Sequence, residues 1–380
     1  MIDLTSTFVG VKIKNPIIIA SSPLTESLDA ILECEANGAG AVISKSCSST
    51  RTGEVGYRRC LIDKKGWWAA STFDREIQDV NEAIIYLSEA VHKCNIPIFA
   101  SVSELTLEPS RWISTCKAVQ QTGVAGIQLD LFYFENVLGE PDFLGKFVKL
   151  LASLQTELQI PIFPKLNINL PTLLMAKIFK KAGISNVSLL DSVSLPAPIS
   201  VKANGAPMLR YTANIKKASL FGAWQYPLTL KYLCELKGKG FSICAGGGIQ
   251  NPSDIVELIL LGANVIQVAT SVILNGYRTI SEYIKGIEDY MLLNDLHSIT
   301  EFQGRALPHS QGTAHYEKAY LCFDESKCIR CNKCIEQAFC NAISRNNEQL
   351  TISKHLCEAC SLCIDLCPSK ALHLELQDTL

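Results

Sequence analysis

The cysteines near the carboxyl end of the chain carry the clearest chemistry in this sequence. Of the sixteen cysteines among 380 residues, eight lie between positions 328 and 367. The second half of this window reads C-x2-C-x2-C-x3-C-P, from Cys357 to Pro368. Bacterial ferredoxins use this spacing, because short turns bring three thiolates to one 4Fe–4S cubane while the fourth cysteine reaches a second cluster. The spacing therefore predicts two such clusters.

Each cluster is expected to take ligands from both halves of the window. The first half departs from the usual spacing, since five residues separate Cys334 from Cys340 and Asn341 stands where proline is usual. The extra residues, 336–339, predict a loop beside one cluster, and Cys322 is the nearby alternative to Cys340. A zinc site is the alternative for the window, but its paired C-x2-C ligands do not need a third cysteine. We expect one cluster to be held by Cys328, Cys331, Cys334 and Cys367, and the other by Cys340, Cys357, Cys360 and Cys363.

The remaining eight cysteines are scattered along the chain. Such cysteines usually behave as small buried hydrophobic residues, and we expect this here. The first residues contain no basic patch followed by an apolar core, so we expect no secretory signal and a cytoplasmic protein without disulfides. The scattered residues are Cys34, Cys47, Cys60, Cys94, Cys116, Cys234, Cys244 and Cys322.

The overall charge and hydropathy exclude two classes of partner. The formal net charge is -2, which argues against nucleic-acid binding because that requires a clustered basic surface. No uninterrupted apolar run approaches the ~18 residues that a membrane span needs. The sequence therefore favours a small-molecule substrate.

Two lysines follow short apolar runs at positions where strands would end. Lys45 ends the run AVISK, and Lys165 ends the run IPIFPK. A lysine buried at such a position must meet an anion or lose its hydration energy. The edge of a flavin suits both lysines, since a cation there favours the anionic reduced ring. A salt bridge to Asp130 or Asp191, which also follow apolar runs, is the alternative.

Small residues follow two later apolar runs and suit a bound phosphate. An Asn-Pro pair at positions 251 and 252 predicts a helix start just after three consecutive glycines. Backbone N–H groups near a helix N-terminus bind phosphate, and glycine allows close approach. A tight turn is the alternative for the glycines. The residues concerned are Gly246, Gly247, Gly248, Ala269 and Thr270.

The lysines, the aspartates and the small residues of the last two paragraphs lie at the ends of apolar, β-branched runs that alternate with helical patterns. The runs predict strands over 15–22, 41–46, 96–103, 126–132, 161–167, 186–194, 240–248 and 264–271. The helical patterns include 76–93, 110–122, 143–157, 171–182, 252–261 and 277–292. Continuous apolar strands of this kind are typical of a parallel sheet that is covered on both faces.

Eight strand–helix units predict an α/β fold, a (β/α)8 TIM barrel whose chemistry lies at the carboxyl ends of its strands. A doubly wound open sheet is the alternative. No G-x-G-x-x-G follows the first strand, so we do not expect this chain to bind NAD(P) itself. We expect the barrel over residues 1–308, a linker over 309–321, and a small bacterial-type ferredoxin domain with two 4Fe–4S clusters over 322–380.

Several segments, taken in order, resemble a known family. NPIIIASS, AVISKS, the lysine at 165 and ICAGGGIQNPSDIVELILLGANVIQVATS resemble the class 1 dihydroorotate dehydrogenases. With its ferredoxin-type tail, the chain is more similar to the pyrimidine-reducing subunits of bacterial dihydropyrimidine dehydrogenases, over nearly its whole length. TSTFVGVKIKNP is similar to the strand pair that closes the bottom of that barrel.

The resemblance implies FMN and electron exchange between FMN and the clusters. It implies an electron partner as well, either a separate NAD(P)H- and FAD-binding reductase subunit or a ferredoxin, and a homo-oligomer. The implied phosphate contacts are Gly247, Gly248, Ala269 and Thr270, and the ring is expected near Ala20, Ser21, Lys45 and Lys165. Asp130, Asp191, Gly222 and Gly246 complete the implied cofactor-binding set.

The loop after the fourth strand departs from these relatives. They carry Asn-x-Ser-Cys-Pro or a close variant, whose cysteine or serine moves a proton while flavin N5 moves a hydride. Here Asp130 replaces the asparagine, and Phe132, Tyr133 and Phe134 replace the serine, the cysteine and the proline. Asp191 likewise stands where an amide would contact a pyrimidine ring. Because a site rejects ligands that leave its polar groups unpaired, we expect a substrate other than a pyrimidine.

Tyr133 is the candidate proton donor, since a branch of the resembled family also carries a tyrosine in this loop. A packing role for Tyr133 is the alternative, and Cys47 and Cys60 are alternative donors. The sequence thus favours an FMN-dependent oxidoreductase that acts on a C=C or CH–CH bond of a small cyclic molecule, with the clusters as its electron path. An electron-transfer subunit without an organic substrate of its own is the alternative function.

Overall fold

The computed structural model describes most of the chain and divides it into two compact units. It describes residues 2–50, 60–63, 68–71, 77–132, 134, 137–196, 198–209, 218–310, 317–337, 340–346 and 349–376. The first unit is Met1–Gln311 and the second is Gly312–Leu380. Among the described residues, no helix has the length and apolar character that a membrane span requires.

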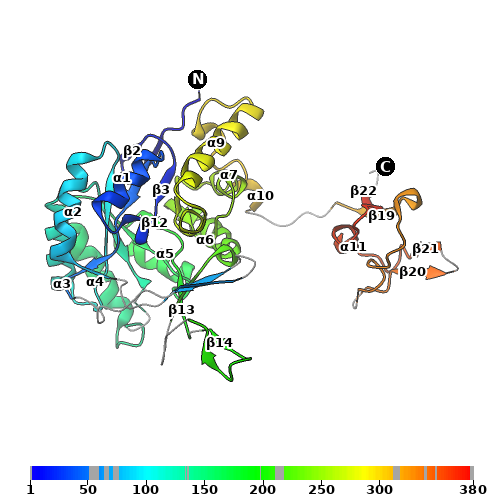
Figure 1. Cartoon of the computed structure of the whole chain (residues 1–380), viewed down its shortest axis with the longest axis horizontal. Coiled ribbons are helices and arrows are strands. Elements are labelled where there is room, and N and C mark those ends of the chain that lie inside the picture. The colour runs from blue at the N-terminus through cyan, green and yellow to red at the C-terminus, as the bar shows by residue number, and fades with distance from the viewer. Residues whose placement is uncertain are drawn as a thin grey trace. The chain divides into compact units, whose positions relative to one another are not determined.

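Eight parallel strands form a closed barrel in the first unit (Figure 1). Each strand pairs with the next one along the chain, and the last pairs with the first, with Ile266 opposite Ile17. This closure confirms the predicted barrel and shows that the open doubly wound sheet is wrong. The strands are β3 (Ile17–Ile19), β4 (Ala41–Ile43), β9 (Ile98–Val102), β10 (Ile127–Asp130), β11 (Ile162–Lys165), β12 (Asn186–Ser188), β17 (Ser242–Gly246) and β18 (Val265–Val268).

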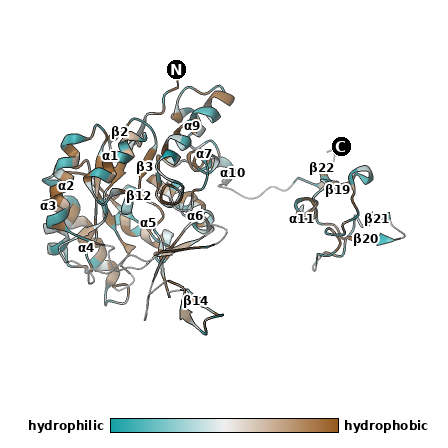
Figure 2. Ribbon diagram, in the orientation of Figure 1, coloured by the Kyte–Doolittle hydropathy of each residue, from teal (hydrophilic) through white to brown (hydrophobic). Residues whose placement is uncertain are grey.

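Helices cover the outside of the ring. Alternate strand residues such as Ile17 and Ile19 pack with helix residues such as Leu87 and Phe147 in the main apolar core. Figure 2 shows hydrophobic colour on the strands and hydrophilic colour on the outward turns of the helices. The helices are α1 (Leu28–Ala36), α2 (Val80–Lys93), α3 (Pro109–Gln120), α4 (Phe143–Glu157), α5 (Thr172–Lys181), α6 (Tyr226–Lys237), α7 (Pro252–Leu260), α8 (Thr270–Asn275), α9 (Arg278–Leu293) and α10 (Leu307–Ser310).

The opening strand pair packs against the amino-terminal end of the barrel. β1 (Ser6–Phe8) and β2 (Val11–Ile13) are antiparallel. Phe8 lies in a second buried cluster with Phe99 and Phe163, and its ring centroid is 5.1 Å from that of Phe163. These aromatic rings pack together at the bottom of the barrel, opposite the carboxyl ends of its strands.

Short strands from distant segments lie above the barrel. β6 (Cys60–Ile62), β7 (Ala69–Ser71), β13 (Val193–Leu195) and β16 (Ala218–Phe221) form a four-stranded antiparallel sheet. β5 (Cys47–Ser48) and β8 (Gln78–Asp79) pair in parallel and extend the barrel sheet from β9. β14 (Ile199–Ser200) and β15 (Ala206–Pro207) form a separate antiparallel pair.

Each of the eight predicted barrel strands ends earlier than expected, by one to six residues, and two of these ends shape the mouth of the barrel. The strand expected over 186–194 ends at Ser188, because Val193 pairs with Leu220 in the antiparallel sheet instead of continuing the barrel. The strand expected over 264–271 ends at Val268, and α8 begins at Thr270. Both differences place a strand end, and hence a loop, at the mouth of the barrel.

The second unit is a small fold around a limited apolar core. Its elements are β19 (Ala319–Phe323), β20 (Ile343–Asn346), β21 (Gln349–Ile352), α11 (Leu362–Asp365) and β22 (Leu372–Leu376). β19 pairs antiparallel with β22, and β20 with β21. Leu321, Ile343, Leu350, Cys363 and Leu372 form the buried core. β19 begins before residue 322, where the sequence placed the start of this domain.

Candidate functional site

A cavity of about 260 Å³ opens at the carboxyl ends of the barrel strands. Gly222 and Gly246, which were also predicted to bind the cofactor, are not among its lining residues. Ten of the twelve predicted cofactor-binding residues line it: Ala20, Ser21, Lys45, Asp130, Lys165, Asp191, Gly247, Gly248, Ala269 and Thr270. These ten residues come from seven of the eight barrel strands and the loops that follow them.

The centre of the cavity holds buried charges of both signs. Lys165 Nζ lies 3.3 Å from Asp191 Oδ2, so the ion pair that the sequence offered as an alternative is present. Lys165 and Asp130 are 5% and 7% exposed. The pairing fixes the direction of the ammonium group, and Lys165 still lines the cavity together with both carboxylates.

A chain of hydrogen bonds runs from the barrel interior to Asp130. Ser46 Oγ donates to Asp130 Oδ2 at 2.6 Å and lies 3.2 Å from Ser21 Oγ and 2.9 Å from Ser101 Oγ. Gln128 Nε2 donates to Ser101 Oγ at 3.0 Å. Because the single hydroxyl proton of Ser46 goes to the carboxylate, the hydroxyls of Ser21 and Ser101 must donate to Ser46.

Asp130 titrates in an unusual environment for a carboxyl group. Burial is the main cause that raises its pKa above the ordinary value of 3.8, and the charge of Asp191 raises it further. The hydrogen bond from Ser46, the charge of Lys165 and the backbone N–H of Phe132 act in the opposite direction without cancelling the shift. A ligand that brings a hydrogen-bond donor or a positive charge to Asp130 would therefore offset the cost of burying this carboxyl group.

The three glycines meet distinct packing demands. A Cβ on Gly246 would lie 2.1 Å from the carbonyl oxygen of Gln267, so this position requires glycine for close strand packing. Gly248 has φ +86°, and a Cβ there would lie 2.3 Å from the backbone nitrogen of Tyr226 at the start of α6. The hydroxyl of Thr229 lies 3.0 and 2.8 Å from the carbonyl oxygens of Gly246 and Gly247. These contacts hold the loop after β17 in a conformation that exposes its backbone to the cavity.

A polar layer lies inside the barrel, below the cavity. Gln128 and Gln267 both lie inside the barrel, and in the described part of the chain their Oε1 atoms have no hydrogen-bond partner. Gln267 lines the cavity, and its Nε2 donates to Ser188 Oγ at 2.9 Å and to the carbonyl of Leu189. The remaining acceptor suits the ring N–H of a flavin, so the polar residues present fit such a cofactor.

The candidate proton donors differ in what the structure says of them. Tyr133 lies outside the described residues. Cys47 is fully buried in β5, where burial raises the pKa of its thiol to about 12, and it is not among the cavity-lining residues. Cys60 does line the cavity, and the sheet register places Cys60 opposite Ser71, and Ser71 opposite Ser219. This cross-strand row forms the polar roof of the cavity.

The cysteines of the first predicted group lie together in the second unit. A small cavity is lined by all four of them, Cys328, Cys331, Cys334 and Cys367. A backbone N–H points to a sulfur atom at Cys328 (3.4 Å, from Arg330) and at Cys367 (3.3 Å, from Ala371). Burial raises the pKa of Cys367, but hydrogen bonds from Ser369 and neighbouring backbone groups outweigh it, so the net shift is downward. A lowered thiol pKa favours the thiolate that metal binding needs.

The second predicted group is brought together only in part. Cys357 and Cys360 lie close enough to Cys363 to raise the pKa of its thiol, after burial, to about 11. No described contact joins Cys340 to them, and residues 338 and 339 of the inserted loop lie outside the described residues. The two loops are built alike, because positive φ recurs at positions 29 residues apart: 330 and 359, and 332 and 361.

Sequence reasoning left several cavity residues unassigned. Gln267 carried a usable signal, because one polar residue inside an apolar strand must face the barrel interior. The roof residues carried none, since they come from short strands far apart in the sequence. The unassigned lining residues include Ser22, Ser46, Ser71, Ser192, Ser219, Phe221, Gln225 and Gln267.

The fold and the cavity define a TIM-barrel enzyme with its site at the carboxyl ends of the strands. A family model described as dihydroorotate dehydrogenase matches residues 3–291, so the chain belongs to the dihydroorotate dehydrogenase family. It is accordingly a flavin-dependent oxidoreductase.

Several curated proteins are similar to the chain over most of its length. It is 22% identical over 354 residues to NAD-dependent dihydropyrimidine dehydrogenase subunit PreA of Escherichia coli (strain K12), covering 87% of this chain and 84% of that protein. It is 24% identical over 317 residues to the catalytic subunit of dihydroorotate dehydrogenase B (NAD(+)) of Thermoplasma acidophilum, covering 81% of this chain and 100% of that protein. It is also 24% identical over 343 residues to the chloroplastic dihydropyrimidine dehydrogenase (NADP(+)) of Arabidopsis thaliana, covering 81% of this chain and 78% of that protein.

Proposed function

We propose that this chain is an FMN- and iron–sulfur-dependent oxidoreductase that acts on a CH–CH or C=C bond of a small cyclic molecule other than a pyrimidine. Electrons pass between FMN and two 4Fe–4S clusters in the second unit. The observation that carries the proposal is the cavity at the barrel mouth, where Lys45, Lys165 and the glycine loop face one space. Family membership supports the flavin, and the cysteine spacing supports the clusters.

The cofactor-binding roles follow from the lining of the cavity. Gly247, Gly248, Ala269 and Thr270 would hold the phosphate through their backbone. Lys45 and Lys165, with Ala20 and Ser21, would lie against the ring. A bound flavin supplies hydride transfer at this site. Lys165 is oriented by Asp191 and favours negative charge on the group beside it, while the Gln267 Oε1 accepts a hydrogen bond.

Asp130 and Asp191 would select the substrate. An ionised carboxylate only accepts hydrogen bonds, whereas a pyrimidine carbonyl needs a donor. Ser46 Oγ and the backbone N–H of Phe132 donate to the two oxygens of Asp130, so the structure places this carboxyl as an acceptor. The site therefore suits a ring that directs N–H or O–H groups, and not carbonyl oxygens, at these two carboxylates, and Tyr133 remains the proposed proton donor.

The cysteine groups would form the electron path. Cys328, Cys331, Cys334 and Cys367 would hold one cluster, and Cys340, Cys357, Cys360 and Cys363 the other. Cys334 also acts on the pKa of Cys363, so the two groups are neighbours. A relative named as a subunit of an NAD-dependent enzyme supports a separate reductase partner, and a ferredoxin is the second candidate.

An electron-transfer subunit without its own substrate is the second candidate function, favoured by the loss of the family's acid/base motif. Protein prepared without oxygen and reduced chemically separates the two functions. Rapid flavin reoxidation by a member of a panel of unsaturated N–H- or O–H-bearing rings supports the enzyme. If no ring compound accelerates reoxidation while an oxidised ferredoxin does, the electron-transfer role holds and the enzyme proposal fails.

A further inference from the structure

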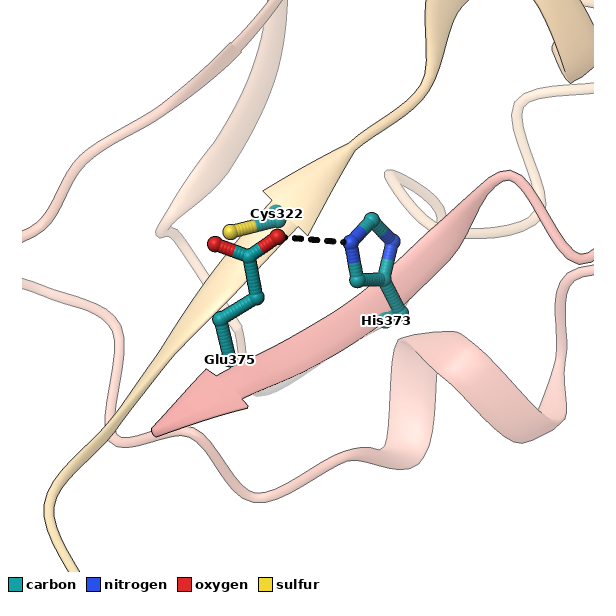
Figure 3. Close-up of side chains that lie close together, drawn as sticks. All are labelled: Cys322, His373 and Glu375. Carbon is teal, nitrogen blue, oxygen red and sulfur yellow. Dashed lines mark hydrogen bonds and ion pairs between the residues drawn. The ribbon is translucent and has the colours of Figure 1, made fainter. Parts of the chain in front are cut away.

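Three metal-ligating side chains gather on one exposed face of the second unit, apart from the cysteine groups described above. Figure 3 shows Cys322 on β19 beside His373 and Glu375 on β22. The register places Cys322 directly opposite His373. Because side chains alternate along a strand, Glu375 lies two residues on and faces the same side as His373. The three groups are therefore fixed by the pairing of one two-stranded ribbon.

The distance between two of the three ligand atoms matches the spacing of ligands around a tetrahedral ion. His373 Nε2 lies 3.2 Å from Glu375 Oε1, and the three ligand atoms all lie within 4.8 Å of one another. Two N or O ligands held at ~2.0–2.1 Å from zinc at a tetrahedral angle are about 3.3 Å apart. The nitrogen and oxygen are thus already at ligand spacing, and the Cys322 sulfur lies within 4.8 Å of both.

The charges of the cluster also suit a divalent ion. A thiolate and a carboxylate together neutralise two positive charges, and a neutral imidazole completes the set. Without a metal, burial and then hydrogen bonding with Glu375 raise the pKa of the Cys322 thiol, so a binding zinc ion has to displace the thiol proton. Lys354 is the neighbouring cation, and its Nζ lies 5.2 Å from the centre of the Tyr320 ring.

We propose that Cys322, His373 and Glu375 form a mononuclear site for Zn²⁺, with water as the fourth ligand. His373 and Glu375 are 51% and 65% exposed, which leaves the fourth position open to solvent. One sulfur with nitrogen and oxygen ligands favours zinc over magnesium or calcium, which prefer oxygen alone. This assignment gives Cys322 a role outside the clusters, and it does not depend on the function proposed for the barrel.

The test uses the full chain, prepared without oxygen so that its clusters are retained, and dialysed against Zn²⁺. Plasma mass spectrometry should find one zinc per chain in addition to the iron. Zinc-edge X-ray absorption should show one sulfur at ~2.3 Å and nitrogen or oxygen neighbours at ~2.0–2.1 Å. Cys322→Ser should remove the sulfur signal and weaken zinc binding at least about tenfold, and Glu375→Gln should weaken it similarly.

Two control variants have matched chemistry elsewhere in the chain. Cys234→Ser changes a partly buried cysteine and His92→Gln an exposed histidine, and both should keep the zinc. Zinc surrounded by three or four sulfur atoms would mean that it occupies the cluster cysteines, and would overturn the proposal. Unchanged zinc in Cys322→Ser, or loss of iron together with zinc in that variant, would overturn it as well.

Discussion

Replacing Gly248 with alanine tests whether the loop after β17 is the cofactor's phosphate cradle. Gly248 has φ +86°, and the added Cβ would lie 2.3 Å from the backbone nitrogen of Tyr226, whereas real contacts need 3.0 Å or more. The left-handed conformation costs alanine about 1–2 kcal/mol. The shift of backbone and side chains that relieves the clash costs a further ~1–3 kcal/mol of stability, as at other overpacked sites. We expect the barrel to lose about 2–5 kcal/mol of unfolding free energy.

Gly240→Ala is the matched control, at the other end of the same strand. Gly240 has φ +77°, but its Cβ would meet nothing within 4 Å. It should therefore show only the conformational cost of about 1–2 kcal/mol. Chemical unfolding of both variants measures the difference, and flavin released from each purified protein measures binding. We expect Gly248→Ala to lose most of its flavin and Gly240→Ala to keep it.

The pair of variants also separates packing from ligand binding. Gly248→Ala can relax only by moving the loop away from the first residue of α6, which displaces the backbone that lines the cavity. If Gly248→Ala retained wild-type flavin content and matched Gly240→Ala in stability, the loop would be an ordinary turn. The phosphate would then have to bind elsewhere in the barrel mouth.

Four further outcomes are expected. Lys165→Ala should lower the flavin content and make the flavin harder to reduce, whereas Lys146→Ala, at an exposed lysine, should change neither. An unchanged flavin potential in Lys165→Ala would mean that Lys165 serves only to pair with Asp191. Because the folded pKa of Asp130 is raised above 3.8, the stability that its protonated form contributes is lost as pH rises through the folded pKa. Asp130→Asn should therefore gain melting temperature relative to the parent as pH rises above about 4, and a constant difference would contradict this. Cys360→Ser should halve an iron content of about eight per chain and keep the flavin; complete iron retention would argue against its role. Uracil, thymine and orotate should turn over poorly, and steady-state rates near ~1 s⁻¹ would contradict that expectation.

The barrel could be predicted from the sequence because the patterns that indicate its strands and helices are local. Each barrel strand is an apolar run bounded by turn residues, and α7 begins at the predicted Asn251-Pro252 pair, where Asn251 and Asp254 form a capping box. Charged residues at strand ends, such as Lys165, had to face either the mouth or an ion partner. The structure shows that Lys165 does both.

The roof of the cavity was not predictable, because its contacts are not local. Ser71 and Ser219 are almost 150 residues apart in the sequence, and only the antiparallel sheet places them opposite each other. No spacing rule relates such short strands to one another. The sequence did not indicate the Cys322–His373–Glu375 cluster either, because its members belong to the first and last strands of the second unit, which are far apart in the sequence.

The two buried carboxylates explain why the family fold need not carry the family substrate. The serine chain from Gln128 to Asp130 delivers donors to the carboxylate from inside the barrel, so the ligand side of Asp130 offers acceptors. Each pyrimidine carbonyl left without a donor would cost roughly 1–3 kcal/mol, or about tenfold in binding for each 1.4 kcal/mol. A ligand that directs N–H or O–H groups at these two carboxylates would instead gain a hydrogen bond at each, while using the same lysines and the same glycine loop.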